Sequence, residues 1–65
     1  MKLCELVQHA DVPRVRLKVV KDGLPRGEMY YMRENIPLMV DRYGGCDVQT
    51  FQADSIGIVA TIKVG

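Results

Sequence analysis

Polar and apolar residues alternate almost without interruption along residues 14–20. One parity carries three basic side chains and the other three aliphatic ones: Arg14, Arg16 and Lys18 against Val15, Leu17 and Val19. Successive side chains of a strand point to opposite faces, so this alternation and the β-branched content predict a half-buried strand. The basic parity then lies on the face that the core leaves open.

A return strand is predicted at residues 28–33, after the turn-forming segment KDGLPRG at residues 21–27. Directly opposite residues of an antiparallel pair share a face. A two-residue turn at Asp22-Gly23 would mix the two faces, whereas a five-residue loop from Lys21 to Pro25 keeps them apart, so we expect the longer loop. The expected partners are Val15 and Tyr31, Leu17 and Met29, Val19 and Gly27, Arg14 and Met32, Arg16 and Tyr30, and Lys18 and Glu28.

A short helix is predicted over residues 36–43. Its apolar residues fall at i, i+3, i+4 and i+7: Ile36, Met39, Val40 and Tyr43. Asn35 is a candidate cap, Pro37 suits the first turn and Gly44 suits the position after the last turn. The alternative is an edge strand at residues 37–40 followed by a turn.

Three further strands are expected, the first at residues 2–8, which mix apolar and polar positions. Residues 46–52 and 57–64 flank a turn and predict a second hairpin with a three-residue loop from Asp54 to Ile56. That register gives these pairs: Cys46 and Val64, Val48 and Ile62, Thr50 and Ala60, Phe51 and Val59, Gln49 and Thr61, and Asp47 with Lys63 as an ion pair.

The order strand, strand, strand, helix, strand, strand predicts an α+β fold. We expect a small two-layer sandwich, with a mostly antiparallel sheet of four to five strands and one short helix covering one face. A small open β-barrel is the alternative. The chain shows no repeat, linker or low-complexity tract, so residues 1–65 are expected to form a single domain.

The charge and hydropathy of the chain limit which kinds of partner it can bind. Nine basic and eight acidic side chains give a net charge of +1, so only a local segregation of charge can support nucleic-acid or membrane binding. The N-terminal segment MKLCELVQHA lacks the apolar stretch of a signal peptide, and no apolar run approaches the ~20 residues that span a bilayer. We therefore expect a cytoplasmic protein without membrane contact, its two cysteines reduced.

No catalytic or metal-binding pattern stands out. The spacing of Cys4, His9 and Cys46 matches no zinc motif, and the glycine-rich segment at residues 44–47 lacks the context of a phosphate loop. We expect the two cysteines to lie near the core. The sequence thus predicts neither an enzyme nor a cofactor.

The candidate site is the exposed sheet face with Arg14, Arg16, Lys18, Tyr30 and Met32 as partner-binding residues. Arginine, tyrosine and methionine are enriched at protein interfaces. Of the two adjacent tyrosines, alternation turns Tyr30 outward and Tyr31 into the core. The leading hypothesis is a non-enzymatic protein-binding module, a small inhibitor or adaptor.

Three alternatives remain open for this face and its sheet. Basic side chains interleaved with an aromatic ring also suit single-stranded nucleic acid. An unguarded sheet edge suits pairing with a second copy, which a domain of this size would favour. A merely solvated face is the third. In length and lack of catalytic groups the chain resembles the small accessory proteins of phages and mobile elements, although no motif carries that likeness.

Overall fold

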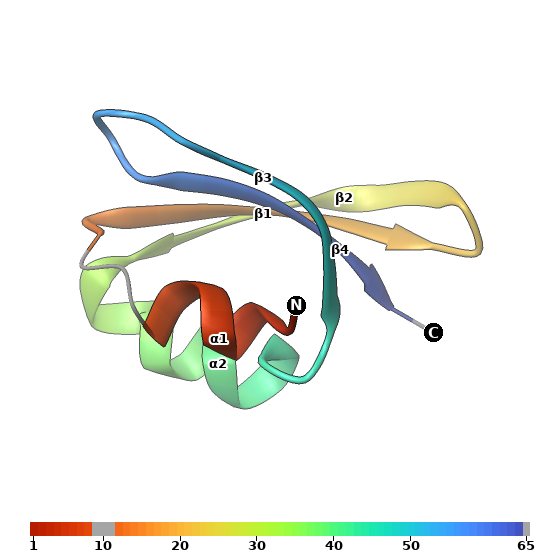
Figure 1. Cartoon of the computed structure of the whole chain (residues 1–65), viewed down its shortest axis with the longest axis horizontal. Coiled ribbons are helices and arrows are strands. Elements are labelled where there is room, and N and C mark those ends of the chain that lie inside the picture. The colour runs from red at the N-terminus through yellow and green to blue at the C-terminus, as the bar shows by residue number, and fades with distance from the viewer. Residues whose placement is uncertain (9–11, 65) are drawn as a thin grey trace.

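Two short helices lie on one face of a four-stranded sheet in the computed structural model, which describes residues 1–8 and 12–64 (Figure 1). The elements are α1 (Leu3–Gln8), β1 (Arg14–Lys21), β2 (Leu24–Met32), α2 (Ile36–Tyr43), β3 (Asp47–Ala53) and β4 (Ile58–Val64), with a 3₁₀ turn, Arg33–Asn35, before α2. The predicted α+β two-layer fold is confirmed. The sheet is open, with β2 and β3 at its edges, so the barrel alternative is wrong.

The strands are ordered β2-β1-β4-β3, which places two hairpins side by side. β1 and β4 run parallel in the centre, and each is antiparallel to its own hairpin partner. The helical connection through α2 carries the chain from one hairpin to the other, as parallel neighbours require. The buried residues of both hairpins therefore pack against the same two helices in a single core.

The first hairpin has the predicted register but a different turn. All six predicted partners from Arg14–Met32 to Val19–Gly27 are confirmed. The chain nevertheless turns at Asp22-Gly23, with φ of 55° and 76°, the left-handed geometry of a tight hairpin turn. A register shift between Val19 and Val20 leaves Arg26 as an extra residue on β2. This bulge restores the parity that the two-residue turn alone would have broken.

The segment predicted as a first strand is the helix α1. Leu3 and Val7, four residues apart, are both buried, which is helical spacing and not strand spacing. The Leu3 and Cys4 amides donate to the carbonyls of Cys46 and Gly44, each at 3.0 Å. These contacts from the α2–β3 connection satisfy amides that a six-residue helix leaves free, and such a helix depends on them for its stability.

The helix α2 has the predicted bounds, so the edge-strand alternative for residues 37–40 is wrong. Two details differ from the prediction. The Asn35 side chain makes no capping hydrogen bond, and Gly44 is right-handed, with φ of −58°. Gly44 is instead packed closely, because a Cβ there would meet the Val40 carbonyl and lie 3.2 Å from Cys4 Cβ.

The second hairpin follows the predicted register only at its open end. Asp47 pairs with Lys63 and Val48 with Ile62, as predicted. A bulge at Gln49 then shifts the register by one residue, so Phe51 lies opposite Ala60 and not opposite Val59. The turn is longer than predicted, since the Asp54 amide donates to the Gly57 carbonyl at 2.9 Å.

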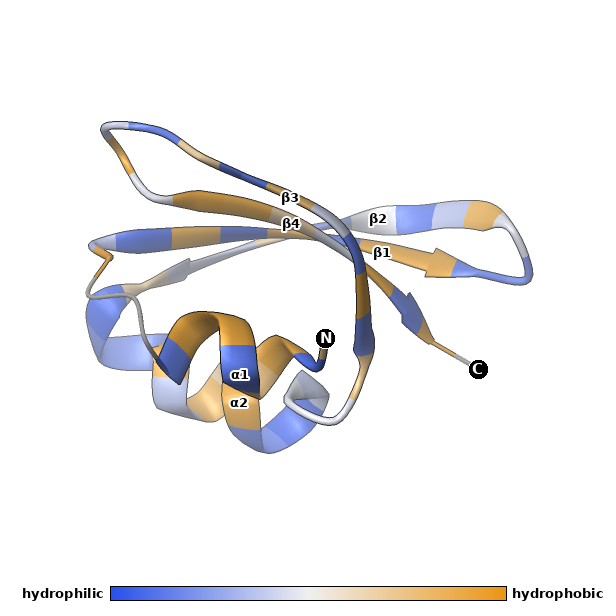
Figure 2. Ribbon diagram, in the orientation of Figure 1, coloured by the Kyte–Doolittle hydropathy of each residue, from blue (hydrophilic) through white to orange (hydrophobic). Residues whose placement is uncertain are grey.

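The core lies between the sheet and the helices. Among residues 1–8 and 12–64 it comprises eight buried side chains: Leu3, Val7, Val15, Leu17, Met39, Ile58, Ala60 and Ile62. The alternation behind this burial is visible along β1 in Figure 2. Cys46 packs against the core, Cys4 is half-buried, and both are free thiols.

Candidate binding face

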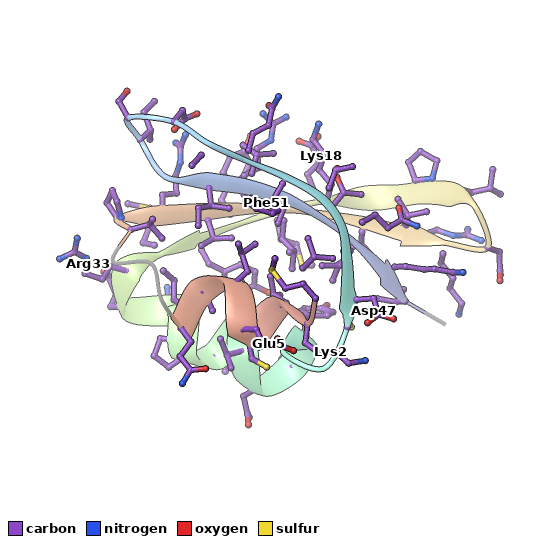
Figure 3. The ribbon with its side chains drawn as sticks, viewed as in Figure 1. Lys2, Glu5, Lys18, Arg33, Asp47 and Phe51 are labelled. Atoms are coloured by element: carbon purple, nitrogen blue, oxygen red, sulfur yellow. The ribbon has the colours of Figure 1, made fainter. Side chains whose placement is uncertain are left out.

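Both helices cover the same side of the sheet, which leaves the other side bare (Figure 1). We call this bare side the open face. Strand parity and register assign it these residues: Arg14, Arg16, Lys18 and Val20 of β1, Glu28, Tyr30 and Met32 of β2, Val59, Thr61 and Lys63 of β4, and Asp47, Thr50 and Gln52 of β3. The structure thus brings together all five residues that the sequence proposed as partner-binding. Lys18 projects from the sheet on the side away from the helices in Figure 3.

Tyr30 and two arginines form the centre of this arrangement. The Cζ atoms of Arg14 and Arg16 each lie 5.6 Å from the centroid of the Tyr30 ring. This distance is within cation–π range, and the guanidinium groups hold the ring in place from the neighbouring strand. Tyr30 is nevertheless 57% exposed, and the nearby Met32 is 50% exposed. The Tyr30 ring is therefore contacted by both arginines and still accessible to a partner.

Glu28 ties the cluster together by bonding to an arginine and not to the lysine directly opposite it. Lys18 stands directly opposite Glu28, but the carboxylate accepts two hydrogen bonds from Arg16, at 3.1 Å from Nε and 2.7 Å from Nη2. This hydrogen bonding, followed by the attraction of the carboxylate charge, raises the pKa of Arg16 above its ordinary value. The diagonal pair suits the planar arginine fork better than the point charge of a lysine.

The sequence did not identify the residues that β4 and β3 add to this face. In the parallel pairing Val59 lies beside Arg16 and Thr61 beside Lys18. On the far side of β4, Gln52 lies opposite Val59 and Thr50 opposite Thr61. The open face therefore continues from the charged cluster onto the mostly uncharged side chains of β4 and β3. The alternation in IVATIKV indicated that Val59 and Thr61 face outward, but no local pattern indicated which strand neighbours β1.

A second ion pair lies at the opposite end of the sheet. The predicted partner of Asp47 was Lys63, which does lie opposite it in the register. The closest ammonium group is instead Lys2 Nζ, 3.1 Å from Asp47 Oδ1 (Figure 3). The hydrogen bond and charge of Lys2 lower the pKa of Asp47, and Lys63 adds a smaller contribution.

An open groove of about 450 Å³ lies on the helical side, between α1 and α2. Its walls are mostly apolar and consist of Cys4, Val7, Gln8, Ile36, Pro37 and Val40. Within residues 1–8 and 12–64, no three histidine, cysteine or acidic side chains gather as metal ligands would. His9, considered above with Cys4 and Cys46, lies outside the described residues. In that same part of the chain no helix has the length and apolarity to cross a bilayer.

No protein-family model, curated protein or solved structure matches this chain. The geometry of the open face is therefore the basis for assigning a function.

Proposed function

We propose that the protein is a non-enzymatic binding module that docks a protein partner on its open face, as a small inhibitor or adaptor. The observation that supports this most strongly is the exposed Tyr30 ring held between Arg14 and Arg16. Tyrosine and arginine are the side chains on which binding energy concentrates at protein interfaces. Met32 adds an adaptable apolar contact beside them.

The order already present in this cluster favours binding. Arg16 is fixed by Glu28, and the Tyr30 ring is fixed by the two arginines. Because these side chains are restrained beforehand, docking costs less side-chain entropy than it would for free rotamers. An open sheet face also suits a macromolecular surface, whereas small molecules are bound in concave sites.

The charge of the open face defines the partner. Four basic side chains, Arg14, Arg16, Lys18 and Lys63, stand against two acidic ones, Glu28 and Asp47. A complementary partner carries acidic groups at its rim and an apolar or aromatic contact for Tyr30 and Met32. The free thiols of Cys4 and Cys46 are compatible with a cytoplasmic location, which we propose with the function.

The test compares two variants of the immobilised protein in affinity capture from a lysate of its source cells. Arg16→Ala/Tyr30→Ala removes the centre of the open face. The matched control, Arg42→Ala/Leu38→Ala, removes an exposed cation and an exposed apolar side chain from α2, on the other side of the molecule. Any partner captured is then purified and its affinity measured directly by calorimetry.

The proposal expects a partner that the control variant retains and the open-face variant loses, with at least tenfold weaker binding in calorimetry, or about 1.4 kcal/mol. Circular dichroism spectra of the two variants must coincide, because none of the four substituted side chains is buried. The proposal is overturned if every captured protein binds Arg16→Ala/Tyr30→Ala as tightly as it binds the unchanged protein.

Single-stranded nucleic acid is a second candidate for the same face, favoured by the exposed ring beside two guanidinium groups. A base stacks on such a ring while cations contact phosphates. Fluorescence anisotropy of labelled oligonucleotides at low and near-physiological salt tests it. Binding that weakens by about one log unit per log unit of salt for each phosphate contact, and that is lost when Arg14, Arg16 and Lys18 are neutralised, would favour this candidate.

A further inference from the structure

The outer edge of β3 is free along most of its length. At its start, the Val48 amide donates to the Met1 carbonyl at 2.8 Å, and Lys2 forms a bridge to Asp47. Beyond that point, no described residue outside the β3–β4 hairpin hydrogen-bonds to the backbone of residues 50–53. The N-terminal residues thus cover one end of the edge and leave the remainder open.

The alternation of the strand shows which backbone groups are unpaired. The Asp54 amide points inward, to the Gly57 carbonyl of its own hairpin. Since successive amides of a strand point to opposite edges, the N–H and C=O groups of Ala53 and Phe51 face outward. Two residues at this edge therefore offer two donors and two acceptors to an added strand.

The side chains leave this edge unprotected. Residues 48–53, VQTFQA, contain neither a charged residue nor a proline. Phe51 is 47% exposed, and Ile56 in the adjoining turn is 52% exposed. The other edge strand, β2, carries Pro25, the bulge at Arg26 and the charge of Glu28, which are the devices that block strand addition. Of the two edges, β3 is the one suited to pairing.

We propose that the free edge of β3 pairs antiparallel with the same edge of a second copy. A two-fold axis perpendicular to the sheet places Gln52 opposite Gln52 of the second copy. Phe51 of each copy then exchanges both backbone hydrogen bonds with Ala53 of the other. In this register the faces match and no like charges meet, since the paired segment carries none.

The resulting assembly is an eight-stranded sheet with all helices on one side and two open faces joined into one surface. The ladder is short, so its interface falls well below the ~1,200 Å² of weak complexes. The dimer is therefore expected to form reversibly and only at high protein concentration. The inference does not depend on the proposed function, because it concerns the edge of the sheet and not a partner on its face.

Sedimentation equilibrium over a range reaching millimolar concentration tests the pairing. The average mass of the unchanged protein is expected to rise with concentration, from the monomer mass of 7.3 kDa towards twice that mass. Gln52→Lys, which sets two lysines directly opposite each other, is expected to remain monomeric. Leu24→Lys adds the same charge at an exposed position of the other edge and is expected to associate like the unchanged protein.

A cross-link provides an independent measurement that does not depend on the lysine variants. Opposite residues of a non-hydrogen-bonded pair have Cα atoms about 4.5 Å apart, which a disulfide can bridge. In a Cys4→Ser/Cys46→Ser background, Gln52→Cys is expected to form a covalent dimer on mild oxidation. Thr50→Cys is the control, since its two copies lie about 14 Å apart in this register. A constant monomer mass, or equal cross-linking of the two cysteine variants, overturns the proposal.

Discussion

Arg16 donates two hydrogen bonds to Glu28 even though Lys18 is the residue directly opposite that carboxylate. Glu28 thereby neutralises the arginine that holds the Tyr30 ring and fixes its direction. Lys18 takes no part in this hydrogen bonding and lies beside Thr61 of β4 in the register. The open face thus combines the Arg16–Glu28 ion pair beside Tyr30 with the positive charges of Arg14 and Lys18.

The first prediction concerns Glu28→Gln. Both side chains of the pair are solvent-exposed, at 36% for Arg16 and 40% for Glu28, so the urea midpoint is expected to stay within experimental error. Partner binding, in contrast, is expected to become more salt-dependent, because Arg16 regains an uncompensated charge. Asp41→Asn on α2 removes the same charge far from the open face and is the control. Identical salt dependence of binding in both variants would exclude a role for the Arg16 charge.

The second prediction concerns the core. Leu17 is fully buried between the sheet and the helices, and Leu38 on α2 is 52% exposed. Leu17→Ala is expected to lower the free energy of unfolding by about 2–5 kcal/mol. In a domain of this size, that loss approaches the whole stability. Leu38→Ala is expected to leave the urea midpoint nearly unchanged. Equal midpoints for the two variants would contradict the assigned core.

The third prediction tests the parallel pairing of β1 and β4. Gly57 immediately precedes β4, and a Cβ on it would overlap the Arg14 backbone carbonyl at the start of β1. Gly57→Ala is therefore expected to force the two central strands apart and to lower the thermal midpoint markedly. A Cβ on Gly45 meets no atom within 4 Å, so Gly45→Ala serves as the control. Equal thermal midpoints would show that β1 and β4 do not approach as described.

The fourth prediction concerns acid stability. Asp54 Oδ1 accepts hydrogen bonds from the amides of Gly57 and Ile56, both at 2.8 Å, and these bonds lower the pKa of its carboxyl group. A lowered folded-state pKa stabilises the fold above the ordinary carboxyl value of about 3.9. That contribution is lost as the pH falls through the lowered value.

Asp54→Asn isolates this effect, because asparagine keeps the accepting Oδ1 but does not titrate in this range. Urea midpoints measured between pH 7 and pH 2 are expected to fall less steeply in this variant than in the unchanged protein. The remaining loss is assigned in part to Asp47, whose pKa Lys2 lowers. Parallel pH profiles for the two proteins would show that the turn does not hold the Asp54 carboxylate.

Local alternation predicted the parts of the fold that depend on strand parity. Arg14 to Val19 gave the register of the first hairpin, because one buried face permits only one pairing parity. The predicted turn was wrong because two different connections are compatible with that parity: a five-residue loop, or a two-residue turn combined with a bulge. No signal in the side chains distinguished Arg26 as the extra residue. The second hairpin was wrong beyond Val48 for the same reason, since the bulge at Gln49 has no parity signature.

Two features could not be predicted from the sequence because contacts between distant segments determine them: the helical conformation of α1 and the part of the open face that β4 provides. Leu3, Leu6 and Val7 fit helical spacing, but a segment this short also fits a strand, and the carbonyls of Gly44 and Cys46 decide between them. Likewise, five residues of the open face were predicted from β1 and β2, whereas Val59 and Thr61 joined them through a parallel pairing across most of the chain. The predicted residues of the site lie on one hairpin, whereas the missed residues reach the site only through tertiary pairing of β1 with β4.

Docking on the open face is tested most directly by a methyl-detected NMR titration of the protein with its captured partner. Met32 and Val59 carry methyl groups on the open face, and Leu38 and Val40 carry them on α2. If the partner docks on the open face, the Met32 and Val59 signals are expected to shift or broaden with increasing partner, while those of Leu38 and Val40 stay in place. Shifts confined to Leu38 and Val40 would place the partner on the helical side and overturn the proposed docking face.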